Sequence, residues 1–268
     1  MDGVLSQEEI NALLNNNDAA DSSDEILTES EKDAIGEIAN ISMGTAATTL
    51  FSLVNRRVEI STPVVSFSNW DKIVDEYEKP CVFIKIGYTQ GLNGSNILVL
   101  KEKDVKIITD LMMGGDGTNI NGEIGELHLS AISEAMNQMM GSSATSLSSM
   151  LNRTIDISPP IAEVVDLKNT LNEGEIDSFL SEEFVKISFH MEIGDLVDSE
   201  IMQLYPPAFV KEMCKGVSQN MELDTQSVTE DVPQSSNTAT QAAPIQQPQD
   251  SGSMNNASAN SQGMINEN

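Results

Sequence analysis

The sequence predicts an α+β fold with pseudo-two-fold symmetry, in which two related halves each place a long helix on a shared, mainly antiparallel sheet. Residues 33–63 match residues 130–160 at a constant offset of 97 without a gap, and 15 of the 31 positions are identical, where chance gives about two. Each copy opens with a long stretch of helical periodicity. The rest of the folded chain contains short alternating runs bounded by turn residues, which is typical of antiparallel strands.

The first long helix is expected from Thr28 to about Asn55. Thr28 and Glu31 form a capping box at its start, in which each side chain satisfies a free backbone donor of the first turn. A strand is expected at residues 58–61, ended by Pro63, because proline cannot donate to a sheet ladder. The core-facing stripe of this helix comprises Ile35, Ala39, Ala46, Leu50 and Leu53.

A second stripe of the same helix lacks bulky apolar residues. Asp33, Glu37, Asn40 and Gly44 are spaced i, i+4, i+7 and i+11, so Glu37 and Asn40 project together from one face. Glycine within a helix costs about 1 kcal/mol relative to alanine. Gly44 therefore predicts the close approach of another backbone or helix at this point.

The remaining elements follow in chain order. A glycine-rich loop at 114–122 lacks the lysine followed by Ser or Thr that completes a Walker phosphate-binding motif, so we do not assign nucleotide binding to it. We expect a hairpin formed by 81–89 and 95–101, a short helix at 102–113, a second long helix at 126–152, strands at 154–158, 161–167, 184–195 and 199–205, and a helix at 206–216.

Two polar segments flank the folded part. Residues 4–14 can form a short amphipathic helix, which either packs on the core of this protein or folds on the surface of a partner. The acidic, polar run that follows has the composition of a linker and favours the second interpretation. We therefore divide the chain into a partner-binding peptide (1–15), a flexible acidic linker (16–27), a folded domain (28–216, with repeats at about 28–63 and 125–160) and a disordered tail rich in Gln, Ser, Asn and Pro (217–268).

The composition excludes several functional classes. Acidic residues outnumber basic ones by 42 to 14, for a net charge of −28, and such a chain repels nucleic acid and anionic membrane surfaces. The two cysteines, Cys81 and Cys214, show no CxxC spacing, which indicates a reducing compartment without a disulfide framework. The sequence contains no signal peptide and no stretch long enough to insert in a membrane. We therefore expect a cytoplasmic protein.

The usual catalytic motifs are absent from the sequence. His128 and His190 are the only histidines and fit neither a triad nor a zinc spacing, so ordinary polar packing is the simpler interpretation of both. There is no G-x-S-x-G motif, and neither cysteine has a nucleophile's local context. What remains is the repeated Glu-x-x-Asn. A single copy would be read as two solvated surface residues, but duplication of both with their long spacings calls for a function.

This pattern resembles the signature of the CheC/CheX/FliY phosphatases of bacterial chemotaxis, over roughly residues 28–216. The signature is an Asp or Ser, then Glu, Asn and a distant Pro, and it is met twice in full. The resemblance implies a CheC-like fold and removal of phosphate from the phospho-aspartate of the response regulator CheY at two sites. It implies catalytic roles for Glu37, Asn40, Glu134 and Asn137, and supporting roles for Asp33, Pro63, Ser130 and Pro160.

The N-terminal segment resembles the phospho-CheY-binding peptide at the start of the flagellar switch proteins FliM and FliY, which places the chain nearest the FliY branch. That branch continues through a linker into a FliN-like domain, whereas this sequence stops within the apparent linker. The resemblance implies the cytoplasmic face of the flagellar basal body as location, and FliM, FliN and FliG as further partners. The implied contacts with phosphorylated CheY are Leu5, Ser6, Glu9, Ile10, Leu13 and Leu14.

The chemistry implied by the resemblance needs no cofactor of the chain's own, because the regulator supplies Mg²⁺ to its own acyl phosphate. A carboxamide can orient water by accepting from it and donating to a neighbouring oxygen, which is the role implied for the two Asn. The two Glu are expected to pair with the regulator's active-site lysine. Two alternatives stay open: a non-catalytic flagellar switch or adaptor protein that binds phosphorylated CheY, and an unrelated acidic scaffold.

Overall fold

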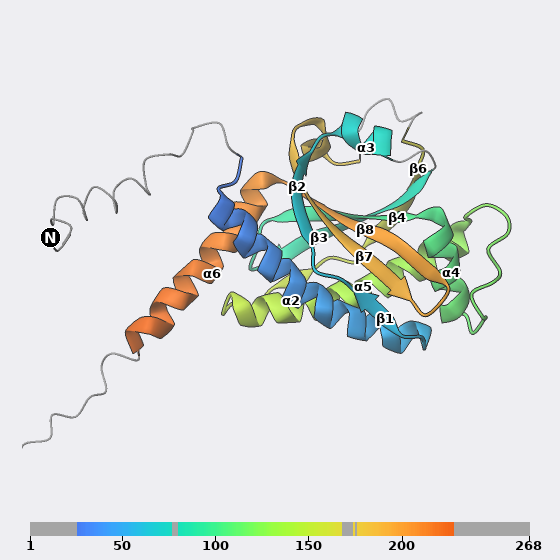
Figure 1. Ribbon diagram of the computed structural model, residues 1–268, viewed down its shortest axis with the longest axis horizontal. Coiled ribbons are helices and arrows are strands. Elements are labelled where there is room, and N and C mark those ends of the chain that lie inside the picture. Colours follow the sequence, from blue (N-terminus) through green and yellow to red (C-terminus); the bar gives the residue numbers. More distant parts are fainter. Residues whose placement is uncertain (1–25, 77–79, 168–173, 175, 228–268) are drawn as a thin grey trace, which may run out of the picture. The chain divides into compact units, whose positions relative to one another are not determined.

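The computed structural model describes residues 26–76, 80–167, 174 and 176–227, and its helices and strands are labelled in Figure 1. The helices are α2 (Glu29–Val54), α3 (Trp70–Glu76), α4 (Glu102–Met112), α5 (Glu126–Met150) and α6 (Pro207–Ser227), with a 3-10 turn η2 (Ser178–Ser181). The strands are β1 (Val58–Ile60), β2 (Val64–Ser68), β3 (Cys81–Gln90), β4 (Gly94–Lys101), β5 (Asp156–Ile157), β6 (Ile161–Val165), β7 (Phe184–Ile193) and β8 (Val197–Tyr205).

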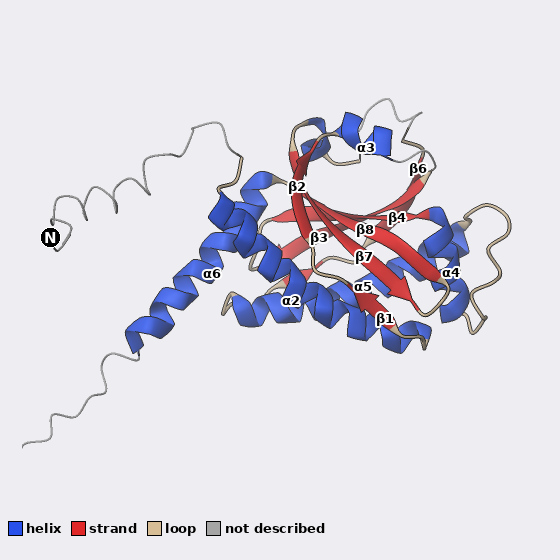
Figure 2. Ribbon diagram, viewed as in Figure 1, coloured by secondary structure: helices blue, strands red, loops and turns tan. Residues whose placement is uncertain are grey.

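The eight strands form one antiparallel sheet in the order β1-β7-β8-β4-β3-β5, with β2 also paired to β7 and β6 also paired to β3 (Figure 2). The edge strands are exchanged between the halves. Strands β1 and β2 of the first repeat pair with β7 of the second half, and β5 and β6 of the second repeat pair with β3 of the first half. The α+β prediction with a shared antiparallel sheet is confirmed, and the exchange explains why the halves fold as one unit.

The two long helices pack against each other across the pseudo-two-fold axis. Ser146 donates a hydrogen bond to Thr45 at 2.8 Å, and Thr49 donates one to Ser142 at 2.8 Å. Because Thr45 corresponds to Ser142 and Thr49 to Ser146 in the repeat, the two bonds are related by the same symmetry. Small hydroxyl residues allow the two helices to approach closely there.

The sheet separates two apolar cores. The larger lies between the sheet and helices α2 and α5, and includes Leu50, Ile132 and Phe189. The smaller covers the other face under α3 and η2, and includes Trp70 and Phe83. Alternate residues of β4 point into different cores, as the two-residue period of a strand requires.

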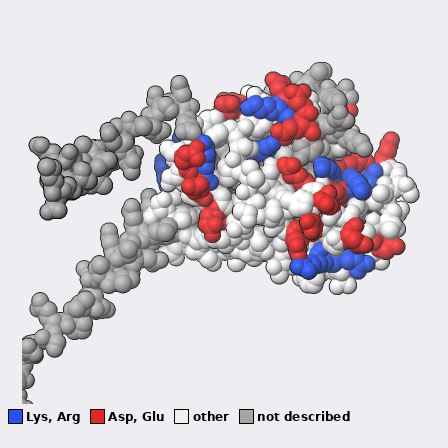
Figure 3. All heavy atoms as spheres, in the orientation of Figure 1, with Lys and Arg blue, Asp and Glu red and all other residues white. Residues whose placement is uncertain are grey.

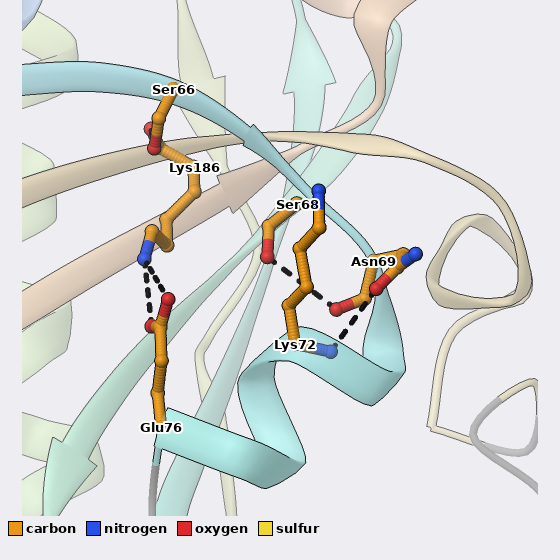
Figure 4. Close-up of polar contacts among 6 residues, drawn as sticks. All are labelled: Ser66, Ser68, Asn69, Lys72, Glu76 and Lys186. Carbon is orange, nitrogen blue, oxygen red and sulfur yellow. Dashed lines mark hydrogen bonds and ion pairs between the residues drawn. The ribbon is translucent and has the colours of Figure 1, made fainter.

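Helix α3 is fixed to the sheet by polar contacts. The Nζ of Lys186 on β7 lies 2.7 and 2.9 Å from the two carboxylate oxygens of Glu76, and Asn69 accepts a hydrogen bond from the backbone N–H of Lys72 at the first turn of α3 (Figure 4). Lys186 is a largely buried side chain, with 13% of its surface exposed. Its pairing with Glu76 therefore offsets the cost of burying its charge.

An asparagine in the left-handed conformation closely follows each long helix: Asn55 is the C-cap of α2, and Asn152 comes directly after Leu151, the C-cap of α5. Asn55 has φ +48°, and Asn152, its partner in the repeat, has φ +46°. Asparagine tolerates this conformation better than most side chains. That both copies of the repeat have asparagine at this position therefore reflects the need to end the helix, after which a short strand follows in each copy.

Three sequence-based expectations require correction. Gly44 meets no close neighbour, because a Cβ placed on it would find no atom within 4 Å; an exposed glycine in this helix has no packing reason here. The sequence analysis assigned no element between Pro63 and Cys81, whereas the structure has strand β2 directly after Pro63 and then helix α3.

Helix α6 does not end at residue 216 but continues to Ser227, because residues 217–227 contain no glycine or proline to stop it. Residues 228–268 of the predicted tail lie outside the described residues.

Candidate active site

The repeated Glu and Asn lie on the outward face of the first half of each long helix. Glu37 and Glu134 are exposed, while Asn40 and Asn137 are half-buried one turn further along. The N-terminal capping box between Thr28 and Glu31 fixes the start of α2, with Thr28 accepting from the Glu31 N–H at 3.2 Å. The two side chains of each pair therefore project together, as their spacing predicts.

Each pair lines a groove between its helix and the turn that joins two edge strands. We name these grooves A and B. Groove A has a volume of about 380 Å³ and groove B about 540 Å³. Groove A is lined by Glu29, Lys32, Asp33, Gly36, Glu37, Asn40, Thr62, Pro63 and Val65. Groove B is lined by Glu126, Leu129, Ser130, Ser133, Glu134, Asn137, Pro159, Pro160, Ile161 and Ala162.

All nine positions of groove A recur in groove B at the offset of 97 residues, and groove B adds Ile161. The structure thus brings the four motif positions together in each half: the Asp or Ser, the Glu, the Asn and the distant Pro. From the sequence, Pro63 was expected to end a strand, and the family resemblance implied supporting roles for Pro63 and Pro160. In the structure they also form one wall of each groove.

Matching hydrogen bonds hold the two proline turns in place. Ser61 donates its N–H to the carbonyl of His190 at 2.9 Å and accepts from the His190 N–H at its hydroxyl at 3.0 Å. Ser158 makes the same two bonds with Gly87, at 2.8 and 3.2 Å. Since Ser61 and Ser158 are identical positions of the repeat, the exchange of edge strands is what carries each proline to its helix.

The polar contacts inside the two grooves differ. In groove A, Lys32 pairs with Glu29 at 2.5 Å, and its Nζ lies 5.3 Å from the centre of the Phe67 ring. In groove B, Gln138 donates a hydrogen bond to the Oε1 of Glu134 at 2.7 Å. The residue that corresponds to Gln138 in the first helix is Ile41, which cannot make such a bond.

The comparisons with known proteins agree with this geometry. The model of the CheC-like family matches residues 31–67 and 127–164, the segments that build the two grooves. The crystal structure of FliY from Thermotoga maritima is 40% identical to this chain, with a TM-score of 0.67, over 73% of this chain and 99% of that one. This chain belongs to the CheC-like family.

Two curated relatives extend the comparison within the CheC-like family. The flagellar motor switch phosphatase FliY of Bacillus subtilis is 47% identical over 218 residues, which is 80% of this chain and 57% of that protein. The CheY-P phosphatase CheC of the same organism is 24% identical over 143 residues, 52% of this chain and 67% of that protein. This chain therefore spans little more than half the length of its FliY relative.

The structure does not bring the remaining reactive residues into either groove. His128 accepts at Nδ1 from the Gly125 N–H at 3.2 Å, as part of the start of α5, and exposed His190 lies 3.0 Å from Glu192. Cys81 and Cys214 are buried, and burial raises the pKa of each thiol to about 11. In the described part of the chain no three His, Cys, Asp or Glu side chains gather as a metal site. The predicted partner-binding residues Leu5, Ser6, Glu9, Ile10, Leu13 and Leu14 lie outside the described residues.

Sequence reasoning missed several groove residues, and the repeat could have revealed some of them. Glu29 and Glu126 are identical at the same offset of 97, four residues before the aligned segment begins. Lys32 and Leu129 differ in type, so no pattern in the repeat marks them, although each lines its groove.

None of the helices in the described part of the chain has both the length and the apolar character of a membrane span.

Proposed function

We propose that this chain removes the phosphoryl group from the phospho-aspartate of the chemotaxis response regulator CheY. The observation that carries the proposal is the recurrence of the groove: nine lining positions are repeated at one offset, with the Glu, Asn and Pro of each groove identical. The names of the relatives, a flagellar motor switch phosphatase and a CheY-P phosphatase, support the same activity.

Hydrolysis requires a water held in line with the bond between phosphorus and the aspartate oxygen. The carboxamide oxygen of Asn40 or Asn137 can accept a hydrogen bond from this water, and the carboxamide NH2 can donate one to a phosphoryl oxygen. The new bond forms between the water oxygen and phosphorus, while the bond to the aspartate oxygen breaks. The products are inorganic phosphate and a free aspartate carboxylate; one proton of the water stays on the phosphate and the other leaves to solvent. Asparagine does not act as a base here, and its contribution is positioning.

Glu37 and Glu134 stand one helical turn before their Asn, on the exposed side of each groove. We assign them to pair with the active-site lysine of the regulator. An ion pair at this point fixes how deeply the helix enters the partner's acidic site, since a mismatch of about 1 Å costs on the order of a hundredfold in rate. Asp33 and Ser130 line the same grooves and help to orient the motif.

We propose that the metal belongs to the regulator. The residues around each Asn fit this division of labour. Groove A is lined by three carboxylates and groove B by two, and among the described residues no three His, Cys, Asp or Glu side chains gather into the compact set of oxygen ligands that Mg²⁺ requires. Bound in the regulator, Mg²⁺ neutralises charge on the transferring phosphoryl group. The residues of this chain then supply water orientation and docking only.

The flagellar motor switch is the proposed setting, given the name of the FliY relative. FliM, FliN and FliG are the proposed neighbours there, and the N-terminal peptide is the proposed tether for phosphorylated CheY. A tether raises the local concentration of the regulator near both grooves without taking part in the reaction.

The deciding experiment measures phosphate release from phosphorylated CheY in the presence of the double variant Asn40→Ala with Asn137→Ala. We expect the accelerated component of phosphate release to fall by about a hundredfold or more, with unchanged circular dichroism. The matched control is Thr48→Ala with Thr145→Ala, two exposed positions of the same helices that correspond in the repeat and line neither groove A nor groove B.

The control variant should keep full activity. Full activity in the Asn double variant would overturn the proposal. If the wild-type chain binds phosphorylated CheY but leaves its decay unchanged or slower, the chain is instead the non-catalytic switch or adaptor protein that the N-terminal segment alone would allow.

A further inference from the structure

We infer that the two grooves are unequal, with groove B the tight docking site for the phosphorylated regulator and groove A a weaker, salt-sensitive one. This inference rests on the proposed function and concerns how that function is divided. It follows from a comparison of two sites that share their Glu, Asn and Pro but differ in the residues around them.

The first difference is the apolar character of the walls. Groove B has Leu129 and Pro159 where groove A has Lys32 and Thr62, and it is also lined by Ile161. Its volume is about 540 Å³ against about 380 Å³ for groove A. Burial of apolar surface is the main source of binding energy at protein interfaces, so groove B offers a partner more of it.

The second difference concerns one exposed residue at the same place in each half. Ile161 on β6 and Val64 on β2 correspond in the repeat, and 68% and 65% of their surfaces are exposed. Ile161 lines groove B, whereas Val64 does not line groove A. These two apolar residues are similarly exposed, and only Ile161 is placed where a ligand in its groove can cover it.

The third difference is the charge that faces the ligand. In groove A the ammonium of Lys32 is paired with Glu29 and lies over Phe67, so the long side chain covers apolar surface beside the groove. Lys32 corresponds to Leu129, which lines groove B. Phe67 corresponds to Val164, which is 43% exposed and does not line it. Groove A also has Asp33 where groove B has Ser130. Binding there depends more on exposed charge, which salt screens.

The carboxylate that is proposed to meet the partner's lysine has a hydrogen-bond donor on its own helix in groove B. Gln138 holds the Oε1 of Glu134 at 2.7 Å, and Glu37 has Ile41 at the corresponding position. A side chain already held in one orientation loses less freedom when it binds. Since the Asn is the same in both grooves, we expect the two grooves to differ in KM more than in kcat.

Two single variants separate the grooves. Asn40→Ala leaves only groove B competent, and Asn137→Ala leaves only groove A. We expect the KM for phosphorylated CheY to be about tenfold lower in Asn40→Ala than in Asn137→Ala, because covering a largely exposed isoleucine corresponds to about that factor in affinity. Added salt should raise the KM of Asn137→Ala more than that of Asn40→Ala.

Ile161→Ser and Val64→Ser form the matched pair that assigns the cause. In the Asn40→Ala background, Ile161→Ser should raise KM several-fold with kcat unchanged. In the Asn137→Ala background, Val64→Ser should change neither. Lys32→Leu in the Asn137→Ala background should lower KM toward the value of groove B. Both serine substitutions replace exposed residues, so folding is kept, and circular dichroism verifies it.

Equal KM values and equal salt dependence in the two single variants would overturn the inference while leaving the proposed function intact. An equal effect of Ile161→Ser and Val64→Ser would do the same. Failure of the proposed function has a different signature, in which neither single variant, nor the double variant, alters the decay of phosphorylated CheY.

Discussion

A single methyl group at Gly91 should destabilise the fold by far more than the same methyl at Gly194. These glycines occupy the equivalent turns of the two halves, between β3 and β4 and between β7 and β8, with φ +80° and +52°. Alanine in this region of backbone conformation costs about 1–2 kcal/mol. That cost applies to both positions.

The two positions differ in the space around them. A Cβ on Gly91 would lie 2.2 Å from the carbonyl oxygen of Thr154 and 2.9 Å from Ile155, whereas a Cβ on Gly194 would meet no atom within 4 Å. The first contact is with backbone, so the chain must move by about 1 Å, and overpacking of this kind costs about 1–3 kcal/mol. Gly91→Ala should therefore lower the free energy of unfolding by about 3 kcal/mol, against about 1 kcal/mol for Gly194→Ala.

Urea unfolding followed by circular dichroism measures both values, and equal m-values would show that the unfolded states are comparable. Because residues 154–158 lead into the proline turn of groove B, a folded Gly91→Ala protein should also lose more of the proposed phosphatase activity in the Asn40→Ala background than in the Asn137→Ala background. Equal losses of stability in the two alanine variants would refute the assigned clash between the turn at Gly91 and residues 154–155, which lie directly before β5.

Two further predictions concern titration and thiol chemistry. Burial alone would raise the pKa of the Asp177 carboxyl, but the hydrogen bonds from Lys85 and Ser95 lower it below the ordinary value. The contribution of ionised Asp177 to the free energy of unfolding is therefore complete above the ordinary carboxyl pKa, and it is lost as the pH falls through the lowered pKa. Asp177→Asn should reduce stability at neutral pH by about 1 kcal/mol and flatten the acid limb of the unfolding curve, and an unchanged acid limb would count against the pairing. Cys81 and Cys214, with pKa values raised to about 11 by burial, should resist a thiol reagent at neutral pH until the protein unfolds, and rapid labelling of the native protein would contradict their burial.

The face of the described chain in Figure 3 shows basic side chains lying beside acidic ones, with broad neutral surface between these clusters. The overall excess of acid is large, with 42 acidic residues against 14 basic. Binding of the proposed partner, which carries a phosphoryl group, therefore cannot rest on attraction between net charges. The proposal instead requires local features of the grooves, namely the carboxylate proposed to pair with the partner's lysine and the apolar walls, to overcome the long-range repulsion.

Much of the candidate site was predictable because the repeat marks it. Glu37 and Asn40 share a helix face by spacing alone, and the same holds for Glu134 and Asn137. The role of the prolines as groove walls was not predictable. Pro63 lies 23 residues after Asn40, and no local rule places a residue that distant against the helix. Its position depends on Ser61 pairing with His190, a contact between the two halves.

The sequence by itself determined the duplication, the two long helices, the capping box of the first of them, the strands of the two hairpins and the Glu-x-x-Asn pairs. Each of these follows from periods of two or 3.6 residues, from turn residues or from direct comparison of the copies, which are local properties of the chain. Only the tertiary structure decided which half supplies the strand beside each edge, and so which residues face each other across grooves A and B. Strand pairing between distant segments depends on the packing of the whole core rather than on local preference. For this reason the exchange of edge strands, and the different walls of grooves A and B, became visible only in three dimensions.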